Sequence, residues 1–131
     1  MLLDTSGLLC YFDKDDPRNP KAVNLANSSP LRVTHNYVLA EFVPLCHTRR
    51  LNRARSLAFV ESLLDDPDVE VAWVDRSLHR AALELLRARP DKTYSLCDAV
   101  SFLLMRRRGV AEALTTDQHF DQEGFTRLLE P

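Results

Sequence analysis

The sequence of 131 residues contains little glycine and cysteine and has no long apolar run. With three glycines, no repeat and no Gly- or Ser-rich linker, we expect one domain over residues 1–131. No window approaches the roughly 18 apolar residues of a membrane helix, and no secretory leader is visible, so we expect a cytoplasmic protein without a membrane partner. The three cysteines, Cys10, Cys46 and Cys97, lie among apolar neighbours and predict buried thiols rather than disulfides.

The charge is nearly balanced, with 17 Lys and Arg against 19 Asp and Glu and a net charge of -2. This balance excludes a polybasic binder of nucleic acid, although it allows an enzyme with a local basic surface. The 45% hydrophobic and 27% charged residues are typical of a globular domain and argue against disorder.

Short apolar strands alternate with amphipathic helices along the chain. We expect strands over 1–3, 31–34, 69–74, 112–115 and 125–129, and helices over 5–12, 22–27, 35–48, 52–65, 77–89 and 95–108. Pro44 lies inside the third helix and indicates a kink. Strands joined by helical crossovers form a parallel sheet covered on both faces, so the fold class is α/β with a mostly parallel sheet. Asp4 and Asp117 each follow a strand, which predicts that both lie at the carboxyl rim of the sheet.

Four acidic residues stand alone in apolar surroundings, unlike the acids of the polar runs 13–16 and 65–68. They are Asp4 in residues 1–12, Glu41 in 37–46, Asp98 in 94–105 and Asp117 in 113–120. None of these windows contains Lys or Arg, so no local ion pair satisfies the carboxylates. A buried carboxylate must be paired, protonated or bound to a metal. Oxygen ligands prefer a hard divalent ion, which predicts Mg²⁺ or Mn²⁺.

Hydroxyl groups near these acids are candidates for orienting the carboxylates or holding metal-bound water. They are Thr5, Ser6, Ser95, Thr115 and Thr116.

Each acid except Glu41 also has a purely structural interpretation. Asp4 fits the N-cap of the first helix, Asp98 follows Ser95 at the capping-box spacing, and Asp117 fits the cap of a short turn. Glu41 lies in the middle of a helix and is no cap. Capping and metal binding are compatible, because a helix N-terminus orients the same side chain that a metal requires.

The order and surroundings of the four acids resemble the PIN-domain nucleases, especially the VapC-type toxins of bacterial and archaeal toxin–antitoxin pairs. The matching segments are Leu2-Leu3-Asp4-Thr5-Ser6, Asn36-Tyr-Val-Leu-Ala-Glu41, Tyr94-Ser-Leu-Cys-Asp98-Ala-Val-Ser-Phe102, Leu114-Thr-Thr-Asp117-Gln-His-Phe120 and the ending Gly124-Phe125 with Leu128. The resemblance spans nearly the whole chain.

The resemblance implies a three-layer α/β/α domain that hydrolyses RNA phosphodiester bonds with Mg²⁺ or Mn²⁺. Asp4, Asp98 and Asp117 would be the metal ligands. Glu41 would complete the catalytic group and position the attacking water, with Thr5, Ser6, Ser95 and Thr116 in supporting positions. The implied partners are RNA, a small antitoxin protein and a second copy of the chain in a homodimer.

Two functional alternatives remain open: a catalytically weak PIN-like module that binds proteins, and a free-standing PIN nuclease without an antitoxin. Other families fit less well. A haloacid-dehalogenase-like phosphatase needs an acid where Ser6 stands, and a receiver domain needs a late lysine, whereas the last lysine is Lys92. The arginines at 49, 50, 53 and 55 follow the Glu41 helix and suit either RNA or solvent. His119, next to Asp117, is the histidine most worth testing.

Overall fold

The computed structural model describes all 131 residues and contains one sheet of five parallel strands. The strands are β1 (Leu2–Leu3), β2 (Arg32–His35), β3 (Val69–Ala72), β4 (Glu112–Leu114) and β5 (Thr126–Arg127). Their order is β3-β2-β1-β4-β5, and every neighbouring pair is parallel. The sequence predicted a mostly parallel sheet, and the structure shows that no strand is antiparallel.

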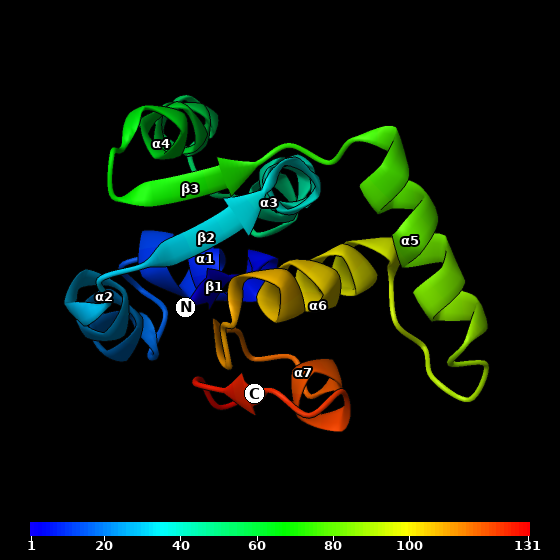
Figure 1. Ribbon diagram of the computed structural model, residues 1–131. Helices are drawn as coiled ribbons and strands as arrows, with labels where there is room; N and C mark the ends of the chain where they lie inside the picture. Colours follow the sequence, from blue (N-terminus) through cyan, green and yellow to red (C-terminus); the bar gives the residue numbers. More distant parts are fainter.

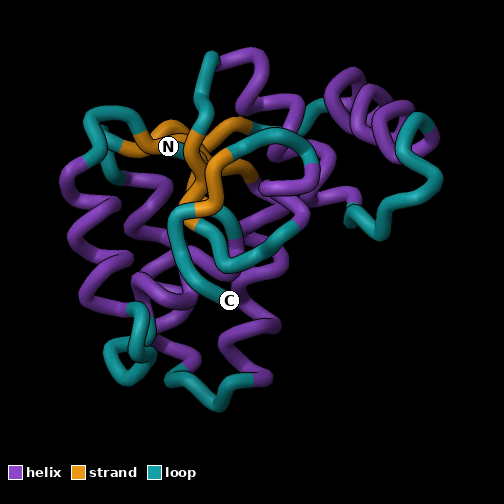
Figure 2. The backbone as a smooth tube through the Cα atoms, turned by 90° about the horizontal axis from the view of Figure 1, so that it is seen from below, coloured by secondary structure: helices purple, strands orange, loops and turns teal.

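Seven helices cover the two faces of this sheet (Figure 1). On one face lie α1 (Thr5–Phe12), α2 (Asn19–Ser28), α3 (Asn36–Thr48) and α4 (Arg53–Asp65). On the other lie α5 (Arg76–Arg87), α6 (Leu96–Arg108) and α7 (His119–Gln122). Figure 2 shows the strands between these two groups. The fold is therefore the expected three-layer α/β/α arrangement.

Two apolar cores fill the space between the layers. One packs α1 to α4 against the sheet around the fully buried Phe42 and Val38, and the other packs α5 to α7 around Phe102 and Phe120. The three cysteines are free and buried, as the sequence predicted. No helix is long and apolar enough to span a membrane.

Several expected boundaries were wrong. The second helix begins at Asn19 rather than at residue 22, because Pro20 occupies a first-turn position where its missing N–H costs nothing. The strands expected over 69–74 and 125–129 are shorter in the structure, where β3 ends at Ala72 and β5 covers only Thr126–Arg127. The short helix α7 was not predicted. The helix α3 continues past Pro44 to Thr48.

The helix α1 touches the sheet at Gly7. A Cβ atom added to Gly7 would lie 1.8 Å from the carbonyl oxygen of Leu114, so only glycine permits this approach of helix to strand. The contact fixes the first turn of α1 beside the end of β4. Because Asp4 precedes α1 and Asp117 follows β4, their side chains come to one edge of the sheet.

The sheet order explains why this edge is a site. Strand β1 lies between β2 and β4, and the connection after β1 leads to β2 on one side, whereas the connection after β4 leads to β5 on the other. Ligands of open parallel sheets bind beyond the carboxyl ends of the strands at such a reversal. The residues that follow β1 and β4 therefore occupy the position where chemistry is expected.

Candidate metal centre

The four solitary acids line a single cavity of about 440 Å³ at the carboxyl edge of the sheet. Only one lining residue, Leu45, is hydrophobic. The complete lining is Asp4, Thr5, Ser6, Glu41, Leu45, Thr93, Ser95, Asp98, Thr116, Asp117 and His119. All four acids and all four supporting residues predicted from the sequence are in this set.

Asp4 is the most deeply held of the acids and is 5% exposed. It occupies the N-cap position of α1, but its side chain makes no capping hydrogen bond. Instead the Thr115 hydroxyl donates to Asp4 Oδ2 at 2.7 Å. Burial raises the pKa of Asp4 to about 7; the bond from Thr115 lowers it, and the charges of Asp98 and Asp117 raise it further. Asp4 thus stands at the predicted N-cap position without capping through its side chain, and a metal-free site favours a proton there.

Glu41 projects from the exposed side of α3 toward the start of α1. The Thr5 hydroxyl donates to Glu41 Oε2 at 3.1 Å. The hydroxyl that follows Asp4 in sequence thereby holds the acid contributed by α3. Thr5, which the sequence predicted as a supporting residue, therefore contacts a site acid directly.

The Asp98 carboxylate belongs to the cap of α6 and also lines the cavity. Its Oδ2 accepts the backbone N–H of Ser95 at 3.0 Å, while the Ser95 hydroxyl accepts the Asp98 N–H, which forms the predicted capping box of α6. The same Oδ2 lies 2.9 Å from Nδ1 of His119. The helix cap and the imidazole together fix the orientation of this carboxylate.

Asp117 lies at the start of the turn into α7. Its Oδ1 accepts the N–H of His119 at 2.9 Å, as the capping alternative proposed, and its Oδ2 lies 3.4 Å from His119 Nδ1. Ser6 and Thr116 brace this segment, because the Thr116 N–H donates to the Ser6 hydroxyl at 3.0 Å. Asp117 therefore both caps the turn into α7 and lines the cavity.

His119 was the histidine singled out from the sequence, but its bonds were not predicted. Its Nδ1 contacts Asp98, its Nε2 lies 3.1 Å from the Thr93 hydroxyl, and its ring packs edge-on against Tyr94 at 5.2 Å between centroids. The imidazole therefore connects α7, the start of α6 and the loop before α6. The sequence signal was its place two residues after Asp117.

The donor set fits a hard divalent cation. One oxygen of each carboxylate is held by a protein donor, whereas Asp4 Oδ1, Glu41 Oε1 and Asp98 Oδ1 accept no hydrogen bond from another side chain. No Lys or Arg forms an ion pair with any of the four acids. Unneutralised carboxylate oxygens around a polar cavity are the ligands that Mg²⁺ and Mn²⁺ prefer. Asp98, Asp117 and His119 alone bring three ligand atoms within 4.8 Å of one another.

Two residues near the cavity do not belong to it. Cys97 is 4% exposed, and burial together with the nearby Glu41 and Asp4 raises the pKa of its thiol, so it stays a neutral core group. Asp121 forms an exposed ion pair with Arg127 at 2.7 Å and is a surface acid.

Comparison with known proteins gives consistent matches over the length of the chain. Residues 1–125 match the family model described as the PIN domain. The chain is 32% identical over 129 residues to the 23S rRNA-specific endonuclease VapC20 of Mycobacterium tuberculosis, in each of two strains, covering 98% of this chain and 97% of the relative. It also superposes on the crystal structure of VapC20, a sarcin–ricin loop cleaving toxin, with a TM-score of 0.87 and 30% identity. That match covers 99% of this chain and 98% of VapC20.

Proposed function

Because the chain belongs to the PIN-domain family, we propose that it is a metal-dependent endoribonuclease and the toxin of a toxin–antitoxin pair. One observation carries the proposal: Asp4, Glu41, Asp98 and Asp117 meet at one cavity, and no Lys or Arg neutralises them. Four carboxylates without a cation repel each other and repel RNA. A divalent ion removes both obstacles.

Asp4, Asp98 and Asp117 are the proposed metal ligands, and Glu41 completes the catalytic group. A bound Mg²⁺ or Mn²⁺ would lower the pKa of a water molecule and offset negative charge on the attacked phosphate. The hydroxyls of Thr5 and Thr115 hold Glu41 and Asp4 through one oxygen each, which leaves the other oxygen free.

The remaining steps concern the proton and the leaving group. Glu41 Oε1 is the free carboxylate oxygen proposed to accept a hydrogen bond from the attacking water, because Oε2 is already held by Thr5. The water oxygen forms a bond to phosphorus, one P–O ester bond breaks, and the departing oxygen takes up a proton. The reaction consumes one water molecule and needs no other reactant.

The substrate proposed first is the sarcin–ricin loop of 23S rRNA, since the VapC20 relative is named for cleaving it. The other partners proposed are a small antitoxin protein and a second copy of the chain in a homodimer. Activity on ribosomal RNA is consistent with a place in the cytoplasm.

Cleavage of a synthetic sarcin–ricin hairpin tests the proposal. We expect cleavage with Mn²⁺ or Mg²⁺, none with EDTA, and none for Asp98→Asn, whose amide keeps one acceptor oxygen for the helix cap. Circular dichroism confirms that the variant is folded. If folded wild-type protein cuts neither this hairpin nor a broad RNA pool with Mn²⁺, the protein-binding alternative replaces the nuclease.

A further inference from the structure

An unneutralised basic segment continues the helix that carries Glu41. Residues 42–60 contain no Asp or Glu, but they contain four arginines, at positions 49, 50, 53 and 55. None of these four forms an ion pair or a side-chain hydrogen bond. Elsewhere most arginines are paired, as Arg89 and Arg106 are with Glu123. The cluster therefore has no ion-pair partner within the chain.

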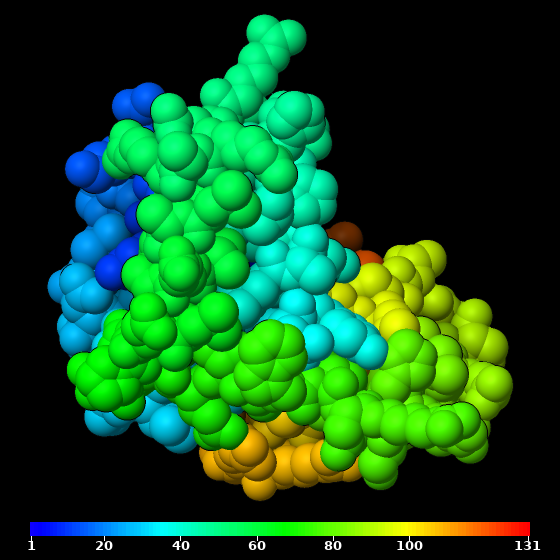
Figure 3. Space-filling model, turned by 90° about the horizontal axis from the view of Figure 1, so that it is seen from above, coloured from blue at the N-terminus to red at the C-terminus, as the bar shows by residue number.

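The segment follows the part of α3 that lines the acidic cavity. Glu41 and Leu45 both line the cavity, and another turn of helix leads to Thr48 and then to Arg49. A rise of about 1.5 Å per residue places Arg49 about 12 Å from Glu41 along the helix axis. Figure 3 shows the cyan α3 segment leading up to the α3–α4 turn at the top of the view.

Arg50 occupies a backbone conformation that normally belongs to glycine. Its φ is 59°, and it is the sole non-glycine residue with positive φ. The N–H groups of Arg50 and Leu51 bond back to the carbonyls of His47 and Cys46, which is a Schellman ending with Arg50 at the position favoured by glycine. The fold alone would be better served by glycine, so the arginine side chain requires another explanation.

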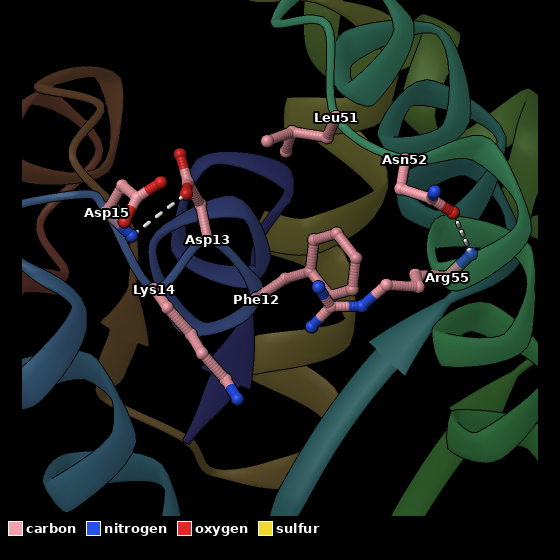
Figure 4. Close-up of a pocket in the computed structure, with 7 residues that line it drawn as sticks. All are labelled: Phe12, Asp13, Lys14, Asp15, Leu51, Asn52 and Arg55. Atoms are coloured by element: carbon pink, nitrogen blue, oxygen red, sulfur yellow. Dashed lines mark hydrogen bonds between the residues drawn. The ribbon is translucent and has the colours of Figure 1, made fainter.

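Arg53 and Arg55 differ from each other in their surroundings. Arg53 begins α4, where the positive end of the helix disfavours a cation, and it has no acidic neighbour in the first turn. Arg55 instead lines a separate cavity of about 120 Å³ together with Asp13 and Asp15 (Figure 4). Arg55 therefore shares its cavity with two acids and Lys14. Arg49, Arg50 and Arg53 form no ion pair, and Asp16, whose pKa the charge of Arg49 lowers, is itself paired with Arg18.

We propose that Arg49, Arg50 and Arg53 bind backbone phosphates of the RNA substrate on the α3 side of the cleavage site. This inference rests on the proposed nuclease function. At about 3.4 Å per stacked nucleotide, 12 Å corresponds to about four nucleotides from the cleaved bond. The contacts carry no base selectivity and fix the position of the strand over the acids.

Fluorescence anisotropy with a labelled sarcin–ricin hairpin tests the inference in an Asp98→Asn background, where binding is read without cleavage. For each of Arg49→Gln, Arg50→Gly and Arg53→Gln, we expect RNA affinity to fall about fivefold at 0.1 M salt. The slope of log affinity against log salt should become shallower by about 0.7. Arg50→Gly should keep or raise the melting temperature, which separates loss of an RNA contact from damage to the fold.

Arg107 provides the matched control, since it is exposed and unpaired but lies on α6 in the opposite layer. Arg107→Gln should leave RNA affinity and salt slope unchanged. In cleavage assays with active protein, KM should rise for the three cluster variants, and an RNA ending within two nucleotides of the cut should show no such rise. Unchanged affinity in all three variants, or an equal loss in Arg107→Gln, would overturn the inference even if wild-type cleavage holds.

Discussion

The hydroxyl of Thr115 donates a 2.7 Å hydrogen bond to Asp4, and the two residues are 111 positions apart in the chain. Strand β1 pairs directly with β4, Leu3 opposite Leu114, so the residues that follow each strand are neighbours in space. The bond therefore depends on sheet register. It holds a carboxylate that is buried and, without a metal, tends to bind a proton.

Replacing Asp4 by Asn should stabilise the metal-free protein at alkaline pH. The folded pKa of about 7 lies above the ordinary value of 3.8, so the contribution of Asp4 to stability is present below pH 4 and is lost as pH rises through 7. The shift sets a ceiling of about 4 kcal/mol on the gain at pH 8. Urea unfolding with EDTA at pH 5 and pH 8 measures it, and an equal difference between the two proteins at both pH values would contradict the expectation.

Binding of Mn²⁺ should release a proton near neutral pH. The metal needs the Asp4 carboxylate, whereas the metal-free site favours its protonated form below a pKa of about 7. Calorimetry at pH 6 and pH 8, in buffers of different ionisation enthalpy, should show tighter binding at pH 8 and net proton release at pH 6. Asp4→Asn is the control, because its amide does not titrate.

His35 should make the protein sensitive to mild acid. It is fully buried beside Ser101, and burial lowers its pKa to about 4 from 6.5. The unfolded chain therefore binds a proton first, and stability falls between pH 6.5 and pH 4, by about 2 kcal/mol at pH 5. His35→Gln should be less stable at pH 7 but lose less between pH 7 and pH 5. Parallel pH curves for the two proteins would rule out His35 as the source.

The imidazole of His119 should matter through the bond that it makes with Asp98. His119→Phe removes both polar contacts while filling similar space, and activity or Mn²⁺ affinity should fall about 10- to 100-fold. His119→Asn keeps an N–H donor near the position of Nδ1 and should recover part of the loss. Equal defects in both variants, with equal melting temperatures, would argue against the hydrogen bond as the cause.

Replacing Gly7 by Ala should reverse the usual effect of that substitution. In most helices the change stabilises by about 1 kcal/mol, but here the new Cβ would meet the carbonyl of Leu114. We expect a loss of about 1–3 kcal/mol and reduced cleavage, since α1 must move away from β4. Thermal unfolding measures the first effect, and a stabilised Gly7→Ala protein would contradict the close approach.

The position of the site was predictable because the sequence pattern that marks each acid is local and strong. A single carboxylate in an apolar window is costly, and the rule for parallel strands places residues such as Asp4 and Asp117 at one edge. The capping box of Ser95 and Asp98 was equally visible from spacing alone. Glu41 stood out because no capping position explains an acid in the middle of a helix.

The detailed contacts depend on tertiary geometry that local patterns do not fix. Asp4 stands where an N-cap stands, yet its side chain turns to Thr115 on a neighbouring strand. The four residues of α7 are too few to show a helical period, so the direction of the His119 ring could not be derived. Likewise, no feature of composition or spacing predicts the positive φ of Arg50.

The pairing of β1 with β4 also sets the stage of synthesis at which the acidic cavity can form. During synthesis, Asp4 is made early, but its hydrogen-bond partner Thr115 follows 111 positions later. The ribosome must therefore translate α6, β4 and the segment that holds Asp117 before the acidic cavity is complete. A product that ends before α6 would carry Asp4 and Glu41 but would lack Asp98 and Asp117, and so would lack the complete cavity.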